Sequence, residues 1–366
     1  MAALRLRYSR LTILFVFSAC FAASHADEPK PAPLTALQRR DIQAATTDFR
    51  AGKKNNEKRA AAVDKANEVG PAGSAALLDV VNKELQPQLG NYRDRFFAQA
   101  TTAAIAKAKA ANPQEIAALR KLVNDLSQQP GLTKEMIVRQ SDLAMKRLTE
   151  LLVLDRRTVL DAAPAFIKQR DAMQELGAHW ERLVVALAKA DAASPAGPST
   201  DAPAALPTFE AYLCQEEELA VQLAVPTDNS TRNVLATNAR SLAPQLDPEE
   251  ARCTLALNLT RNLLGLPPLV IDLKLATAAR GHSADMEARK FFDHESPVPG
   301  KATPWDRAKL AGTTASGENI AMGTLEGTLA NQMWWHSPGH HKNMLGDHVR
   351  VGLGRNGRYW TELFGK

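Results

Sequence analysis

Apolar positions along the chain separate a long helical region from a mixed C-terminal part. Between residues 37 and 190, apolar side chains recur at helical spacing in a composition rich in Ala, Leu, Lys and Gln, which favours helices. The clearest stripe, stepping by three and four residues towards the end of this region, comprises Phe166, Met173, Leu176, Trp180, Leu183 and Leu187. Such spacing is typical of a seam that faces another helix. We therefore predict a separate all-α region, a bundle or coiled-coil-like scaffold, over residues 37–190.

The pattern changes again after this region. Residues 191–207 are rich in Pro, Ala and Ser and carry too few apolar side chains to form a core, so they predict a disordered linker. Residues 208–246 return to helical spacing and are interpreted as a helical lead-in. A second domain is then expected over residues 247–366.

Helix signals open this second domain. Asp247, Pro248 and Glu250 occupy the N-cap, first and third positions of a predicted helix, and Gly265 ends it. A following helix is predicted from apolar and polar positions on one face: Leu275, Ala278, Ala279, His282, Met286 and Arg289.

Alternation with a period of two marks the end of the chain. Val349, Val351 and Leu353 alternate, Asn356-Gly357 is a strong hairpin-turn signal, and Trp360 and Phe364 return on one face. Helices followed by an antiparallel hairpin predict an α+β fold for the C-terminal domain.

The first 26 residues are interpreted as a signal peptide. Arg5, Arg7 and Arg10 precede a short apolar run, and small residues end at Ala26, which is typical of an export signal. Residues 27–36 form a Pro-rich lead. Cys20 offers an alternative, a lipoprotein processing site, although Phe17 matches that pattern poorly. We expect an exported protein, secreted or periplasmic, without a transmembrane segment in the mature chain.

The charge and the cysteines of the chain bear on its partners and on a possible disulfide. The net charge is +5 and the Lys and Arg residues are scattered, which argues against a nucleic-acid partner. In an exported chain, Cys214 and Cys253 invite a disulfide, and two buried thiols are the alternative.

Candidate chemistry gathers in the C-terminal third. His294, Glu318 and His340 lie in the segments FFDHESP, SGENIA and SPGHHKNML. Pro338 predicts a helix start with Ser337 as the N-cap, so His340 falls in the first turn, where the helix dipole favours neutral imidazole. A neutral imidazole binds a metal or accepts a proton. His336 and His341 are interpreted as surface or capping residues.

Five segments in order carry a family resemblance: LNLTRNLLGLPPL, HSADMEARKFFDHESP, GENIA, WWHSPGHHKNML and VGLGRNGRYWTELFG. The region from Cys253 to Gly365, about a third of the chain, resembles the CAP superfamily of cysteine-rich secretory, antigen 5 and pathogenesis-related proteins, in its bacterial, SCP-like form. The helical region resembles no family that we can name.

The resemblance implies an α-β-α sandwich in which His294 and His340 face each other across a cleft. It implies that Glu318 lies beside them, that Asn319 holds the loop, and that Trp334 contributes to the core or the cleft lining. Asn258 and Arg261 match the first-helix motif, where a structural role is expected. The family's second acid, on the tryptophan helix, is missing, which argues against an acid–base pair of two carboxylates. The alternative interpretation of His336 is that it takes the place of this acid.

Three functions follow as hypotheses. The leading one is a non-catalytic binding module whose cleft takes a divalent metal, a small apolar or lipid-like ligand, or a cell-envelope partner. The metal would be held by His294 and His340. The second is a hydrolase in which His294, Glu318 and His340 hold Zn²⁺ and activate water. The third is a cell-envelope scaffold that works through its helical region.

Overall fold

The computed structural model describes residues 33–192 and 208–366. The N-terminal part is helical and the C-terminal part is a mixed helix and sheet domain, so the predicted α+β class is confirmed. The predicted signal peptide, most of the Pro-rich lead and residues 193–207 of the predicted linker lie outside the described residues. No helix within the described ranges is long and apolar enough to cross a membrane.

The chain divides into two compact units whose boundaries differ from the predicted ones. Of the described residues, those up to Ala100 and those between 155 and 220 form the first unit, and residues 101–154 and 221–366 form the second. Residues 101–154 were expected in the helical region, but their apolar side chains join the C-terminal core. Val123, Ile137 and Leu148 are fully buried in the same cluster as Leu257 and Trp334.

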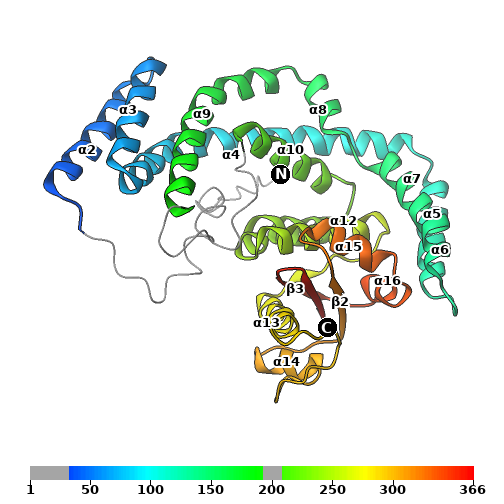
Figure 1. Cartoon of the computed structure of the whole chain (residues 1–366). Coiled ribbons are helices and arrows are strands. Elements are labelled where there is room, and N and C mark those ends of the chain that lie inside the picture. Colours follow the sequence, from blue (N-terminus) through cyan, green and yellow to red (C-terminus); the bar gives the residue numbers. More distant parts are fainter. Residues whose placement is uncertain (1–32, 193–207) are drawn as a thin grey trace. The chain divides into compact units, whose positions relative to one another are not determined.

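Helices alone build the described part of the first unit (Figure 1). They are α2 (Ala36–Ala51), α3 (Asn56–Val69), α4 (Pro71–Ala110) up to Ala100, α8 (Arg156–Ala162), α9 (Ala165–Ala192) and α10 (Phe209–Leu223) up to Ala220. All six residues of the predicted apolar stripe on α9 are buried, which confirms the seam. Near it, the buried Glu217 carboxylate accepts hydrogen bonds from Arg156, Arg170 and Tyr92.

A helical hairpin belongs to the second unit. It runs through α5 (Pro113–Ser127), α6 (Lys134–Met136), the π-helical turn η1 (Ile137–Ser141) and α7 (Asp142–Leu152). Asn112 caps α5 through hydrogen bonds from the backbone N–H groups of Gln114 and Glu115, and Pro113 is the first helical residue.

A four-stranded sheet forms the centre of the second unit. Its strands are β1 (Val270–Ile271), β2 (Gly317–Met322), β3 (Arg350–Asn356) and β4 (Tyr359–Gly365). Their order is β1-β3-β4-β2, and only the β1–β3 pair is parallel. The remaining helices are α11 (Asn229–Thr237), η2 (Asn238–Leu242), η3 (Ala243–Gln245), α12 (Pro248–Leu263), α13 (Leu273–Arg289), α14 (Pro304–Leu310), α15 (Gly327–Trp335) and α16 (Pro338–Met344).

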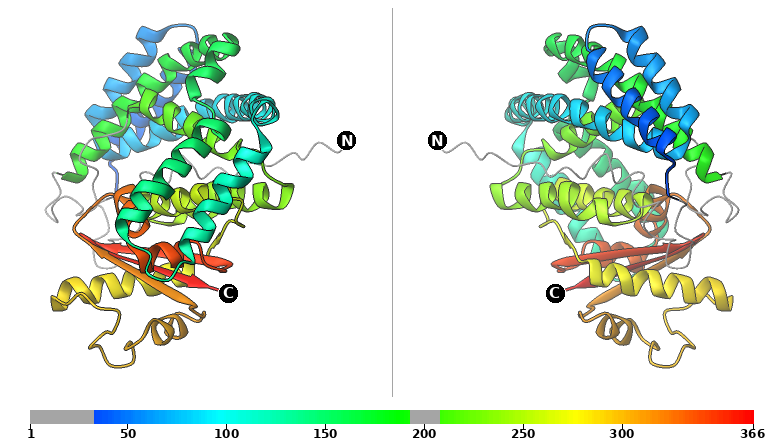
Figure 2. Two further views of the ribbon diagram at one scale, coloured as in Figure 1. Left: turned by 90° about the vertical axis from the view of Figure 1, so that its right-hand side faces the viewer. Right: turned by 90° about the vertical axis from the view of Figure 1, so that its left-hand side faces the viewer.

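These helices cover both faces of the sheet. Figure 2 shows α13 and α14 on one face and α12 on the other, with α15 and α16 on the side of α12. The domain is therefore an α-β-α sandwich. The α12 start is as predicted, because Asp247 and Glu250 form a capping box around Pro248.

The predicted C-terminal hairpin forms, but its turn lies one residue later than the expected Asn356-Gly357. Asn356 pairs with Tyr359 across a two-residue turn that begins at Gly357, whose φ of +53° lies in the left-handed region. Trp360 and Phe364 are fully buried on one face. Because side chains alternate along a strand, Glu362 lies between them on that same face.

Two glycines of β3 let α13 lie directly on the sheet. A Cβ atom at Gly352 would stand 2.2 Å from the backbone nitrogen of Ala276, and one at Gly354 would stand 2.0 Å from that of Arg280. Val351 and Leu353, the alternate residues, are fully buried in the opposite core. Any side chain at either glycine would push α13 away from the strand.

The predicted disulfide is wrong, because Cys214 and Cys253 are both free thiols. They belong to different compact units. Cys253 is fully buried in the core with Leu257 and Trp334, and burial holds the pKa of its thiol well above the usual value. It therefore acts as a small apolar core residue.

Candidate ligand-binding site at the edge strand

The edge strand β2 positions the two faces of the candidate site. Successive side chains of a strand point to opposite faces, so Glu318 and Asn319 diverge. Glu318 contacts Arg307 of α14, whereas Asn319 contacts Asn343 of α16. Figure 1 shows α14 and α16 on opposite sides of β2.

Glu318 is an almost fully buried acid with both carboxylate oxygens engaged. Its Oε1 accepts a hydrogen bond from Nδ1 of His294 at 2.9 Å, and its Oε2 accepts one from Nη2 of Arg307 at 2.6 Å. The side chains of Glu318 and Arg307 are each 2% exposed, whereas that of His294 is 49% exposed. The acid is thus an internal counter-charge that orients His294.

Arg307 also shapes the loop that carries His294. Its Nη2 donates to the backbone carbonyl of His294 at 3.0 Å, and its Nη1 donates to those of Lys301 and Ala302. One buried guanidinium therefore ties three carbonyls of the loop to the acid on β2. Arginine suits this role because its fork of donors is rigid and stays charged.

His340 reaches the site from the opposite helix layer. It lies in α16, which starts at Pro338 with Ser337 in the N-cap position, as predicted, although the Ser337 side chain makes no capping hydrogen bond. The ring centroids of His294 and His340 are 6.5 Å apart, with planes inclined by 51°. The two imidazoles are therefore brought together, as the resemblance implied.

The surroundings of the two imidazoles shift their pKa values in opposite directions. The hydrogen bond to Glu318 raises the pKa of His294 above its usual value. Burial, and then the positive charge of His294, lower the pKa of His340. The neutrality expected of His340 from the helix dipole has burial as its main cause here. The shifts favour the cationic form of His294 and the neutral form of His340.

A buried polar network lies under His340. Asn319 donates from Nδ2 to Oε2 of Glu362 at 2.7 Å, and its Oδ1 accepts from Nδ2 of Asn343 at 2.9 Å. Asn343 also donates to the backbone carbonyl of Glu318, and Asn319 to that of His340 at 3.5 Å. The network links β2, β4 and α16, and it fixes the backbone at Glu318 and His340.

Glu362 is the second acid that the sequence interpretation missed. Its side chain is fully buried, and Oε1 has no hydrogen-bond partner among the described residues. Burial raises the pKa of Glu362 to about 8, against the opposing effects of Asn319 and Arg261. The carboxyl is therefore largely protonated at neutral pH. The alternation that places Trp360 and Phe364 in the core is the signal that could have identified it.

Arg307 was missed as well, and here the sequence holds no comparable signal. It lies in a seven-residue helix beside Asp306 and Lys309, where an arginine is normally a solvent-exposed residue. Its burial depends on the fold that brings α14 to β2.

Other predicted residues have internal rather than ligand-facing positions. Trp334 is 1% exposed and lies in the core, so its predicted cleft-lining role is not supported. Asn319 is fully buried within the network. Asn258 pairs with the backbone of Leu269, and Arg261 donates to the carbonyls of Pro267, Met344 and Gly346, which confirms structural roles.

The interpretation of His341 as a surface residue is wrong, because the helical hairpin covers this side of α15. His336 is the C-cap residue of α15, and its side chain is 20% exposed. Asp142 of α7 accepts hydrogen bonds from the indole Nε1 of Trp335 at 2.7 Å and from Nε2 of His336 at 2.9 Å. His341 is fully buried, with its ring centroid 4.1 Å from that of Trp335. Both neighbouring tryptophans, Trp334 and Trp335, are consequently buried.

The residues of the site do not fit a three-ligand zinc centre. Zinc in hydrolases needs three protein ligands and an open position, and both oxygens of Glu318 are committed to His294 and Arg307. The buried positive charge of Arg307 further opposes a cation. Within residues 33–192 and 208–366, no three His, Cys, Asp or Glu side chains are grouped to hold a metal ion.

Comparison with known proteins agrees with this geometry. Residues 255–359 match the model of the CAP family, described as the cysteine-rich secretory protein family. The C-terminal third of this chain is a bacterial CAP domain. The match includes His294, Glu318 and His340, whereas the helical hairpin and the first unit lie outside it.

Two relatives of the CAP domain come from Bacillus subtilis (strain 168). The uncharacterized protein YkwD is 37% identical over 134 residues, which are 35% of this chain and 51% of YkwD. The uncharacterized membrane protein YlbC is 34% identical over 108 residues, which are 29% of this chain and 31% of YlbC. The chain thus spans about half the length of one relative and about a third of the other.

A solved structure is also similar, that of an extracellular protein containing an SCP domain from Bacillus anthracis str. Ames. It is 27% identical, covers 41% of this chain and 49% of its own, and has a TM-score of 0.32.

Proposed function

We propose that this chain is an exported binding protein whose CAP domain holds its ligand at His294 and His340. One observation supports the proposal: the carboxylate of Glu318 is already paired with two basic side chains. Both oxygens of Glu318 are engaged by His294 and Arg307, so the acid orients an imidazole and is not left as a free base. The residues left to meet a ligand are the two partly exposed imidazoles.

The charges of the site favour a hydrogen-bond-accepting or anionic group on the ligand. The raised pKa of His294 favours its protonated form, which donates hydrogen bonds, and the lowered pKa of His340 favours its neutral ring, which offers one donor and one acceptor. A divalent cation would meet the positive charges of His294 and Arg307 within the same site. Among the ligands considered from the sequence, a small molecule or envelope component with a polar or acidic head group therefore fits best.

Export is proposed from the N-terminal sequence. The three arginines, the apolar run and the small residues before Asp27 support it. The scaffold alternative is carried by the helical first unit, in which the stripe on α9 is buried rather than presented to a partner. No contact in the site favours the hydrolase alternative, because that reaction needs Glu318 free.

Retention of a ligand through purification is the test of binding. Full-length protein and its His294→Ala, His340→Ala and double variants are purified in parallel from the native host. Small molecules are then extracted and compared by mass spectrometry. We expect at least one molecule in stoichiometric amount with the wild type and loss of most of it in either single variant, with little further loss in the double variant, because residues of one site are not additive.

Lys342→Ala is the matched control, since Lys342 is an exposed residue of α16 beside these histidines. It should retain the ligand as the wild type does. Equal recovery from all variants would show that the extracted molecules bind elsewhere, and the proposal would then have to be abandoned.

A further inference from the structure

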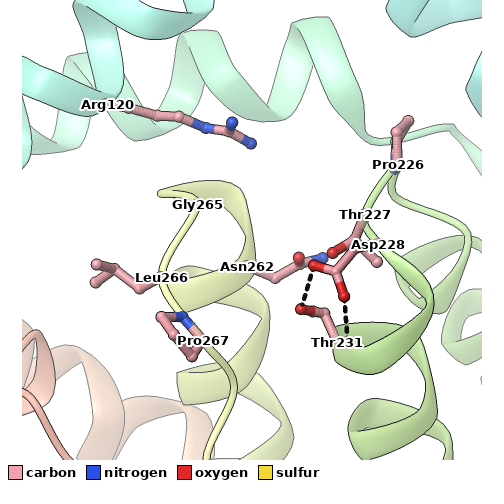
Figure 3. A pocket seen from close by; sticks show the side chains of 9 residues that line it. All are labelled: Arg120, Pro226, Thr227, Asp228, Thr231, Asn262, Gly265, Leu266 and Pro267. Carbon is pink, nitrogen blue, oxygen red and sulfur yellow. Dashed lines mark hydrogen bonds between the residues drawn. The ribbon is translucent and has the colours of Figure 1, made fainter.

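A pocket of the second unit is lined by none of the residues of the His294–His340 site. It has a volume of about 300 Å³, within the size range of small-molecule sites. The residues that line it come from α5, from the segment that leads into α11 and from the end of α12 (Figure 3): Arg120, Pro226, Thr227, Asp228, Thr231, Asn262, Gly265, Leu266 and Pro267. Arg120 lies outside the CAP domain match, so the hairpin completes this pocket.

Arg120 brings an uncompensated positive charge to the pocket. Its Nε donates to the carbonyl of Leu263 at 2.8 Å, which fixes the side chain over the end of α12. No carboxylate pairs with Arg120 in the described part of the chain, and burial is the cause that lowers the pKa of its guanidinium. The group remains charged at neutral pH, so its terminal N–H donors are available to an anion.

Gly265 lies directly against the guanidinium of Arg120. Its φ of +75° ends α12, and a Cβ atom there would lie 3.4 Å from both Cζ and Nη1 of Arg120. The guanidinium therefore rests against the bare glycine backbone. Figure 3 shows it extending from α5 over Gly265, above the level of Asn262.

Asn262 supplies a second donor that has no partner in the protein. The residue is 4% exposed, and its Nδ2 makes no hydrogen bond within the described residues. A buried donor without a partner costs about 1–3 kcal/mol. Figure 3 shows its amide extending from α12 towards Thr227 and Asp228, so a ligand in the pocket would reach the donor.

The opposite wall offers an acceptor. Asp228 caps α11, with Oδ1 accepting from the backbone N–H of Thr231 and Oδ2 from its hydroxyl, both at 2.8 Å. These hydrogen bonds hold the pKa of Asp228 below its usual value, so it is ionised at neutral pH. Carboxylate oxygens accept more than one hydrogen bond, and the ligand can therefore add a donor here.

We propose that this pocket binds a small carboxylate that carries a hydroxyl or amino group beside it. Arg120 and Asn262 bind the carboxylate, because a guanidinium fork and an amide N–H match its two oxygens. Asp228 accepts a hydrogen bond from the neighbouring hydroxyl or amino group. The pairing of two donors with one acid selects this class over a simple anion.

Saturation-transfer NMR on the full-length protein tests the site with glycolate as the probe. We expect saturable binding of glycolate, weaker binding of acetate, which lacks the hydroxyl, and little displacement of glycolate by inorganic phosphate. Arg120→Gln and Asn262→Asp should each weaken glycolate binding by about tenfold or more, the size of one hydrogen bond to a charged group. Arg139→Gln is the matched control, since Arg139 is an exposed residue of the same hairpin, and it should change nothing.

Two variants with different chemistry keep the test independent of folding, and circular dichroism confirms that each is folded. Absence of saturable binding to the wild type overturns the proposal. Equal glycolate binding by the wild type and both folded variants overturns it too, because the binding is then elsewhere. Acetate or phosphate binding as tightly as glycolate overturns the assigned ligand class.

Discussion

Replacing Glu362 by Gln should stabilise the CAP domain at alkaline pH and leave it nearly unchanged in mild acid. Gln has the shape of the protonated acid and can accept the hydrogen bond from Asn319 that Oε2 now accepts. It carries an NH2 group in place of the O–H group of the acid, and it never ionises. The substitution therefore isolates the cost of charging a carboxyl that is fully buried beneath the site.

The magnitude follows from the shifted pKa. Burial raises the pKa of Glu362 from 4.5 to about 8, and one pKa unit corresponds to about 1.36 kcal/mol. In the folded state the carboxyl keeps its proton up to about pH 8, whereas in the unfolded state it ionises near 4.5. The stability due to this proton is full below pH 4.5 and is lost as the pH rises to about 8. The loss amounts to at most about 5 kcal/mol.

Denaturant unfolding at several pH values measures this difference. Tryptophan fluorescence reports on the second unit, which holds Trp305, Trp334, Trp335 and Trp360. Between mild acid and about pH 9, the free energy of unfolding of Glu362→Gln should rise relative to the wild type by several kcal/mol, up to about 5. Glu326→Gln, at an exposed position of the same unit, is the control and should show no such trend. A constant difference between wild type and Glu362→Gln across this range would refute the reasoning.

Three further predictions concern His294, Asp142 and the two cysteines Cys214 and Cys253. Glu318→Gln should lower the pKa of His294, measured by NMR titration of the imidazole, because the hydrogen bond to Glu318 is the main cause that raises it; an unchanged titration would mean that the ring is not held by the acid. Asp142→Ala should destabilise the second unit by about 1–3 kcal/mol in denaturant unfolding, because Trp335 and His336 lose the hydrogen-bond acceptor that they share. Asp125→Ala, which removes an exposed pair with Lys121, should cost well under 1 kcal/mol. Equal losses would contradict the bridging role of Asp142. Cys214 and Cys253 should both be alkylated by iodoacetamide in denatured, unreduced protein. In folded protein, Cys253 should react far more slowly than in denatured protein, because it is fully buried. A linked Cys214–Cys253 pair in mass spectrometry would contradict the free thiols.

Local patterns were enough to predict much of the second unit. The capping box at Asp247 and the hairpin turn at Gly357 depend on residues close together in sequence, and both form, the turn one residue later than expected. The approach of His294 to His340 came from the family resemblance and not from spacing, because the two residues belong to different segments.

Long-range packing could not be predicted from these patterns. The stretch 101–154 has helical spacing like its neighbours, but only the fold shows that it joins the C-terminal core and supplies Asp142 to Trp335. Arg307 is unremarkable in sequence because its burial depends on contact with Glu318 from another element. The disulfide was mispredicted for the same reason, since cysteine count holds no information on which unit each thiol joins.

Glu318 is held by His294 and Arg307, and we therefore propose that the CAP site binds a ligand and does not turn over a substrate. The most direct measurement is hydrolysis of a panel of ester and peptide substrates by purified full-length protein and its His340→Ala variant, with and without a metal chelator. The account predicts the same background rate in every case. Saturable turnover by the wild type that disappears in His340→Ala would contradict it.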